Sequence, residues 1–144
     1  MTTLQRPLRA TASKVPAVTA LFWVIKVLTT GMGETASDFL AHTLAPPVAV
    51  GLGALGLAAA LGLQFAARRY VTWIYWLAVV MVSVFGTMAA DVLHIGLGIP
   101  YVVSTVAFAI VLVVVFVTWH RVEGTLSIQQ VDTRRRELFY WAPC

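Results

Sequence analysis

Apolar residues occur in four long runs along this chain, separated by short polar connections. The runs cover Val15–Leu44, Val48–Ala67, Val71–Leu93 and Tyr101–Trp119. About 20 helical residues, at about 1.5 Å each, cross a hydrocarbon core of about 30 Å, so every run is long enough to span a membrane. Strand-like alternation is absent, and a chain in lipid must satisfy its backbone hydrogen bonds internally. The pattern therefore predicts an all-α, polytopic membrane protein with a four-helix transmembrane bundle.

Composition agrees with this prediction and argues against other classes of protein. Hydrophobic residues make up 60% of the 144 residues and charged residues only 11%, whereas soluble domains carry about 25% charged residues. A secretory signal does not explain the first run, which is too long and contains Lys26, Glu34 and Asp38. The net charge of +4 does not indicate a nucleic-acid partner, because the basic residues flank the predicted helices. The lone cysteine, Cys144, excludes an internal disulfide.

The placement of lysine and arginine predicts how the chain is oriented. Basic residues lie before the first run, between the second and third, and after the fourth: Arg6, Arg9, Lys14, Arg68, Arg69, Arg121, Arg134, Arg135 and Arg136. The connections His42–Pro47 and His94–Pro100 contain neither lysine nor arginine. Since cytoplasmic loops carry the excess of basic residues, both termini and the middle connection are expected in the cytoplasm. Lys26 is the one basic residue that does not follow this pattern.

The chain repeats itself at an offset of 53 residues. The first run pairs with the third as Trp23 with Trp76, Thr30 with Ser83, Gly33 with Gly86, Glu34 with Thr87 and Asp38 with Asp91. Each unit contains two helices, so both units have the same orientation and form a parallel repeat. We predict a cytoplasmic N-terminal segment (1–14), a first two-helix repeat (15–67), a second (68–120) and a cytoplasmic amphipathic tail (121–144).

The tail carries what we interpret as the truncated start of a third repeat. Phe139–Trp141 is similar to Ile74–Trp76, and Arg134–Arg136 precedes it much as Arg68 and Arg69 precede the second copy. The alternative is a chance aromatic cluster at the membrane surface, where Tyr and Trp are common. The basic and aromatic residues also suit a segment lying on an anionic cytoplasmic surface.

Motif residues distributed over both copies and the tail point to a family. They are Lys14–Trp23, Lys26, Thr29–Thr35, Asp38, Tyr75, Trp76, Gly86, Thr87, Asp91, Arg121–Ser127 and Phe139–Trp141. With these residues the chain resembles the bacterial uncharacterised membrane-anchored proteins built from tandem two-helix transmembrane repeats of unknown function. The resemblance implies a multi-pass protein of the bacterial inner (plasma) membrane, without an established activity. Family members typically carry four repeats, so it also implies half of such a protein: a fragment, a frameshifted product or a self-assembling half.

A polar stripe marks the candidate pathway through the membrane. Lys26, Thr30 and Glu34 are four residues apart on one helical face, and the third run repeats the stripe with Ser83 and Thr87. At about 1.5 Å per residue, Lys26 lies about 15 Å into the bilayer, where ionisable residues are costly and usually functional. A carboxylate coupled to this cation through water or a partner helix would bind and release a proton or a cation. The alternative for Lys26 is snorkelling toward the cytoplasm.

Carboxylate and imidazole groups recur at the outer ends of the first and third runs. Asp38 and His42 are four residues apart, and Asp91 and His94 are three apart, so each pair lies on one helical face. Helical bundles assemble divalent-metal sites from such pairs. The alternative is ordinary polar residues facing water. No other cofactor is expected, and the absence of a nucleophile–base pair or cofactor motif indicates that the chain is not an enzyme.

Small and aromatic residues are interpreted as helix-packing positions: Trp23, Trp76, Gly33, Gly86, Ala54, Ala58 and Gly62. Ala54–Gly62 forms a small-xxx-small ridge, the expected contact face of a homodimer that restores eight helices. We predict a small transporter or ion-conducting protein for a cation or protons. The alternative is a non-transporting anchor or subunit, or an inactive half-length fragment, in which the polar stripes only pack helices.

Overall fold

Every regular element in the described part of the chain is helical. The computed structural model describes residues 15–124, 126, 131 and 133–143. The elements are α1 (Ala20–Thr43), α2 (Pro46–Ala66), α3 (Thr72–Asp91), the π-helical turn η1 (Val92–Gly96), α4 (Tyr101–Glu123) and α5 (Arg134–Trp141). The all-α class predicted from the sequence is therefore confirmed.

Local sequence signals explain where these helices begin and end. The Thr19 hydroxyl accepts a hydrogen bond from the Phe22 backbone N–H at 3.2 Å and caps α1. Pro46 occupies the first position of α2, where its missing N–H has no helical partner to lose. Gly124 ends α4 with a φ of 67°, the left-handed conformation that glycine adopts most readily. Thr133 caps α5 as Thr19 caps α1.

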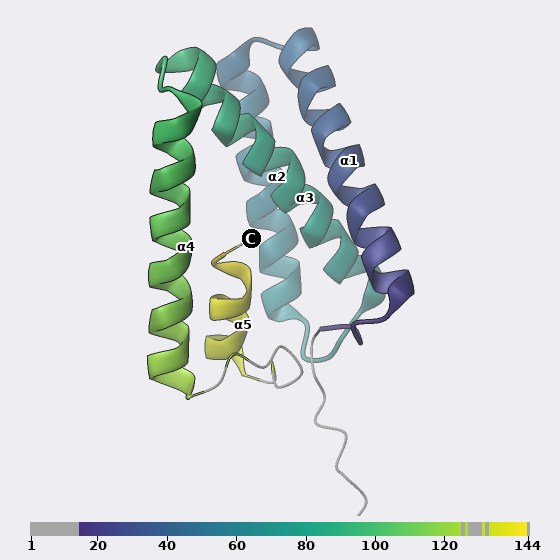
Figure 1. Ribbon diagram of the computed structural model, residues 1–144. Coiled ribbons are helices and arrows are strands. Elements are labelled where there is room, and N and C mark those ends of the chain that lie inside the picture. The colour runs from purple at the N-terminus through teal and green to yellow at the C-terminus, as the bar shows by residue number, and fades with distance from the viewer. Residues whose placement is uncertain (1–14, 125, 127–130, 132, 144) are drawn as a thin grey trace, which may run out of the picture.

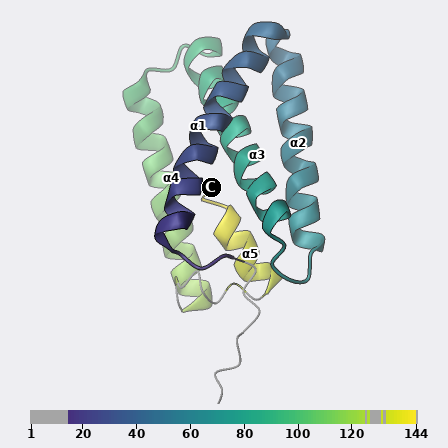
Figure 2. The same cartoon turned by 90° about the vertical axis from the view of Figure 1, so that its right-hand side faces the viewer.

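The central helix is α3, which packs along both α1 and α2 (Figures 1 and 2). The two core clusters lie along it: one gathers around Tyr75 and Val79, the other around Val84 and Met88. α4 stands apart from this group, and α5 lies between α4 and the other helices. The parallel repeat thus places its two first helices, α1 and α3, side by side.

Three of the helical segments are long and apolar enough to cross a membrane, among the described residues: Pro46–Ala66, Thr72–Gly96 and Tyr101–Glu123. α1 has 24 residues, a sufficient length, but it is not among the three, since its polar stripe lowers its hydropathy. The predicted bundle is therefore supported for three helices, and a crossing by α1 stays a prediction.

Much of the apolar side-chain surface faces outward. Ser104 and Trp119 are the buried residues of α4, while Val102 is 75% exposed and Val113 60% exposed on the same helix. Exposed apolar surface of this extent is typical of contact with lipid or with another chain.

The structure differs from the expected surface-lying tail. Glu137 and Trp141 of α5 are buried, and the Gln64 amide of α2 donates a hydrogen bond of 3.1 Å to the Glu137 carboxylate. The hydroxyls of Tyr140 in α5 and Tyr75 in α3 lie 2.7 Å apart. These polar contacts, together with the buried Trp141, hold α5 against the bundle.

Candidate functional site between the two repeats

α1 and α3 approach each other closely at Gly33. A Cβ atom built on Gly33 would overlap the Ser83 side chain. The Ser83 hydroxyl donates a hydrogen bond of 3.1 Å to the Thr30 carbonyl oxygen. Small residues at such interfaces let two backbones approach. Two positions of the predicted stripe, Thr30 and Ser83, therefore meet at the contact between the repeats.

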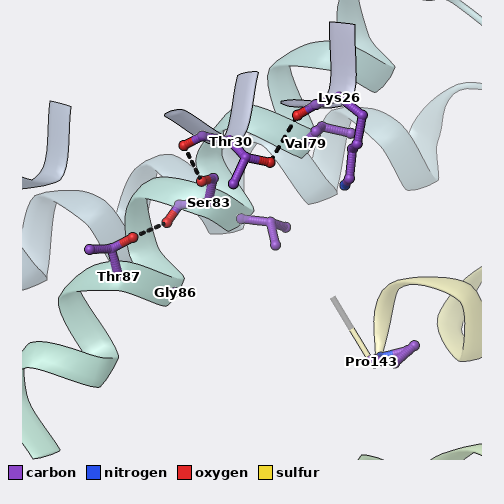
Figure 3. Close-up of a pocket in the computed structure, with 8 residues that line it drawn as sticks. Lys26, Thr30, Val79, Ser83, Gly86, Thr87 and Pro143 are labelled. Carbon is purple, nitrogen blue, oxygen red and sulfur yellow. Dashed lines mark hydrogen bonds between the residues drawn. The ribbon is translucent and has the colours of Figure 1, made fainter. Parts of the chain in front are cut away.

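Beside this contact α1 and α3 border an open hollow of about 430 Å³ (Figure 3). Its described lining is Lys26, Thr30, Val79, Val82, Ser83, Gly86, Thr87 and Pro143. Four of the five predicted stripe residues are thus brought together at one site. Glu34 is exposed and does not belong to this lining.

The hydroxyl groups of the hollow are already committed as donors. Thr30 donates to the Lys26 carbonyl at 2.8 Å, Ser83 to the Thr30 carbonyl at 3.1 Å and Thr87 to the Ser83 carbonyl at 3.1 Å (Figure 3). Their oxygens keep lone pairs that accept hydrogen bonds from a bound molecule. Donation to the carbonyl four residues earlier, as by Thr30 and Thr87, also explains how hydroxyl residues fit an apolar helix.

Lys26 is the one charged residue of the described lining. No described residue forms an ion pair with its ammonium group. The hollow therefore combines a single positive charge with acceptor oxygens. The positive charge favours a negatively charged group over a cation, while the acceptor oxygens favour a hydrogen-bond donor, such as a hydroxyl, on the same solute.

The predicted metal-binding residues separate at the other end of the helices. His42 and Asp91 line a second hollow, of about 330 Å³, whereas Asp38 is exposed outside it. Within the described residues, no three or more His, Cys, Asp or Glu side chains form a group able to hold a metal ion. The four side chains predicted to form a metal site are not assembled into one.

His94 contacts the α3–α4 connection and the start of α4 instead of the other predicted metal ligands. Its Nδ1 lies 2.9 Å from the Ile99 carbonyl, and its Nε2 lies 3.3 Å from the Ser104 hydroxyl. The ring stacks on Tyr101 with the centroids 3.8 Å apart. The π-helical turn follows α3 directly and directs His94 toward the start of α4, which helical spacing alone does not predict.

The predicted packing residues divide into covered and open positions. The Trp76 ring contacts Phe22 of α1, with 5.6 Å between centroids, whereas Trp23 is 59% exposed. Gly33 is buried against α3, while a Cβ at Gly86 would meet nothing within 4 Å. Equivalent positions of the two repeats therefore have different surroundings.

On α2, the glycines that contact α3 are not those of the predicted ridge. A Cβ at Gly62 would meet nothing within 4 Å, and Ala58 is exposed. Gly53 and Gly56 instead face Met88 and Met81 of α3. A signal for this face was present, because Gly53, Gly56 and the buried Ala60 follow a helical i, i+3, i+7 spacing.

Sequence reasoning also missed the polar contact between α2 and α5. Gln64 is buried and reaches Glu137. It is the one polar side chain among the 21 residues of α2, and a lone polar group in an apolar helix usually faces a protein partner. The position of Gln64 as a lone polar residue was therefore the feature of the sequence that could have indicated this contact.

Comparison with known proteins agrees with the repeat. The model of the family described as Repeat of Unknown Function (DUF347) matches twice, at residues 21–70 and 74–125. The matched segments begin 53 residues apart (21 and 74), which is the offset found in the sequence. No curated protein and no solved structure matches the chain.

Proposed function

Since this chain belongs to the family of the Repeat of Unknown Function (DUF347), whose description assigns no activity, we propose a function from the chain's own geometry. It is a membrane protein that binds and carries a small anionic solute that also bears a hydrogen-bond donor, such as a hydroxycarboxylate. The solute occupies the hollow between α1 and α3, with the Lys26 ammonium as its charged contact. The observation that carries the proposal is a positive side chain without an ion-pair partner, among the described residues, in a hydroxyl-lined hollow.

The depth of Lys26 strengthens this proposal. α1 crosses the bilayer as a fourth span alongside α3, with both termini on the cytoplasmic side of a bacterial inner membrane. Lys26 then lies six residues after the first residue of α1, about 9 Å along the helix at about 1.5 Å per residue. Ionisable residues at that depth are rare and face a cavity or a partner. Solute sites of repeat-built transporters lie at the contact between repeats, and the hollow borders both α1 and α3.

The charge of the hollow favours an anion over the cation or proton expected from the sequence. That expectation depended on Glu34 lying in the same pathway as Lys26. With Glu34 exposed outside the lining, a cation would meet the ammonium group without a carboxylate to offset the repulsion. An anion would gain a charge-assisted hydrogen bond from Lys26.

Replacing Lys26 with methionine is expected to abolish solute flux. Methionine preserves an unbranched, flexible side chain and removes the charge, so an anion loses its strongest contact. Flux is measured in liposomes containing the purified protein. The probes are labelled lactate, succinate and chloride, together with Mn²⁺ and protons. Lys26→Arg, which keeps the charge, should retain part of the anion flux.

The matched control is Glu34→Gln on the same helix. Anion transport predicts that this variant behaves like the wild type, because Glu34 lies outside the hollow. A cation or proton pathway predicts the reverse: flux of Mn²⁺ or protons that Glu34→Gln removes and Lys26→Met does not. That outcome would replace the anion proposal.

A second function, a non-transporting packing module, is favoured by one specific observation. Ser83 of α3 donates to the Thr30 carbonyl of α1, so the stripe also serves to hold α1 against α3, whereas Thr30 and Thr87 donate within their own helices. This candidate predicts no flux of any probe through the wild-type protein. It also predicts that Ser83→Ala lowers the thermal stability of the folded chain.

A further inference from the structure

One aromatic contact occurs twice along the chain. Phe22 of α1 and Trp76 of α3 have ring centroids 5.6 Å apart at an interplanar angle of 45°. Tyr75 of α3 and Trp141 of α5 have centroids 5.6 Å apart at 48°. Tyr75 is the repeat equivalent of Phe22, and Trp141 occupies the place of Trp76 in its motif. α5 therefore meets α3 as α3 meets α1.

Beyond Val79, which is buried, this face of α3 becomes open: Val82 is half-buried and Gly86 is exposed. We call Val79, Val82 and Gly86, which line the hollow, the Gly86 face. Its repeat equivalent on α1 contains Gly33, which is covered by Ser83 of α3. Nothing within 4 Å would meet a Cβ at Gly86 itself. α5 thus contacts the end of α3 around Tyr75, and Gly86 stays uncovered.

α1 carries the complementary face, and it is also open. On α3 this face contains Trp76 and Ser83, which contact α1. The equivalent residues of α1 are Trp23 and Thr30, which we call the Trp23 face. Trp23 is 59% exposed, and Thr30 is exposed. One chain therefore presents both the Gly86 face and the Trp23 face, which together would form a contact of the α1–α3 type.

We propose that a second copy of this chain docks its α1 on the Gly86 face of the first copy. The partner's Trp23 takes the place of Trp141 against Tyr75, and the partner's Thr30 packs on Gly86. α5 is displaced from the end of α3 when the partner binds. This assembly does not depend on which solute, if any, enters the hollow.

A second copy is the occupant because the two open faces belong to the same chain. In a two-fold dimer each copy offers one Gly86 face and one Trp23 face, so all four faces are used at once. The contact between α1 and α3 is then repeated around a closed ring of four helices. The hollow beside Lys26, open in one copy, becomes the interior of that ring.

Cysteine cross-linking between two differently substituted chains tests this geometry. One chain carries Gly86→Cys, the other Thr30→Cys, and both carry Cys144→Ser. Mixed in lipid and oxidised, they are expected to form a disulfide-linked dimer, while neither chain alone does so. The absence of a cross-linked dimer from the mixture would overturn the proposed contact.

Leucine substitutions separate this interface from the α2 ridge. Gly86→Leu and Gly62→Leu both place a side chain where a Cβ meets nothing within 4 Å, so each single copy is expected to fold. Gly86→Leu should eliminate the dimer, measured by single-molecule counting in lipid, and Gly62→Leu should leave it intact. The opposite pattern would assign the interface to α2 and overturn the proposal.

Displacement of α5 has its own measurement. Trp141→Ala removes the ring that competes for Tyr75 and is expected to raise the dimer fraction at a given protein-to-lipid ratio. A lower dimer fraction in this variant would show that α5 supports the assembly and would contradict the proposed displacement of α5.

Discussion

Alanine at Gly33 is expected to destabilise the protein by about 1–3 kcal/mol, the usual cost of overpacking a tight contact. A Cβ at this position would overlap the side chain of Ser83 and lie close to its backbone. The overlapped atoms include the Ser83 Cβ, which rotation of the side chain does not move. Relief therefore requires α1 and α3 to separate.

Gly86 provides a matched control, since it is the repeat equivalent of Gly33. In a single copy its Cβ would meet nothing within 4 Å, and alanine favours a helix over glycine by about 1 kcal/mol. Thermal unfolding of the monomer in detergent should thus give a lower Tm for Gly33→Ala and an unchanged or higher Tm for Gly86→Ala. Equal shifts for the two variants would contradict the close approach at Gly33.

Replacement of Tyr75 by alanine is expected to cost about 3–5 kcal/mol, as for other buried aromatic residues. Tyr75 is 1% exposed. Its ring contacts Tyr70, Trp76 and Trp141, and its hydroxyl lies 2.7 Å from that of Tyr140. One side chain thus joins α3 to α5, and its removal should release α5 from the bundle.

Tyr75→Phe separates the ring from the hydroxyl. It keeps the aromatic contacts and loses a hydrogen bond, for an expected cost of about 0.5–1.5 kcal/mol. Limited proteolysis measures the release of α5 directly, with rapid cleavage after Arg134–Arg136 expected in Tyr75→Ala and slow cleavage in Tyr75→Phe. If α5 of Tyr75→Ala resists cleavage like the wild type, contacts other than Tyr75 hold it.

The helical class and the repeat offset were predictable because both are encoded locally. Apolar run length is sufficient to predict helices in lipid, and α2, α3 and α4 agree with three of the four runs. The offset of 53 residues needed only the spacing of motif residues such as Trp23 and Trp76, and the family match begins at the same offset.

Candidate site residues were predictable only in part, because residues spaced four apart on a helix do not all point in the same direction. Four residues turn a helix by about 400°, so a four-residue stripe rotates by about 40° at each step. Lys26 and Thr30 line the hollow, but two such steps place Glu34 about 80° around α1 from Lys26. There it is exposed and outside the lining.

The helical class, the parallel repeat and the stripe positions Lys26, Thr30, Ser83 and Thr87 were predictable without a structure, since they follow from periodicity and spacing. The tertiary structure sets which faces meet. It directs His94 toward Ser104 and packs α5 against Tyr75. The two equivalent glycines show the reason: Gly33 and Gly86 have the same place in their repeats, yet one is covered by Ser83 and the other is open. What surrounds a residue depends on neighbouring helices, which local spacing does not specify.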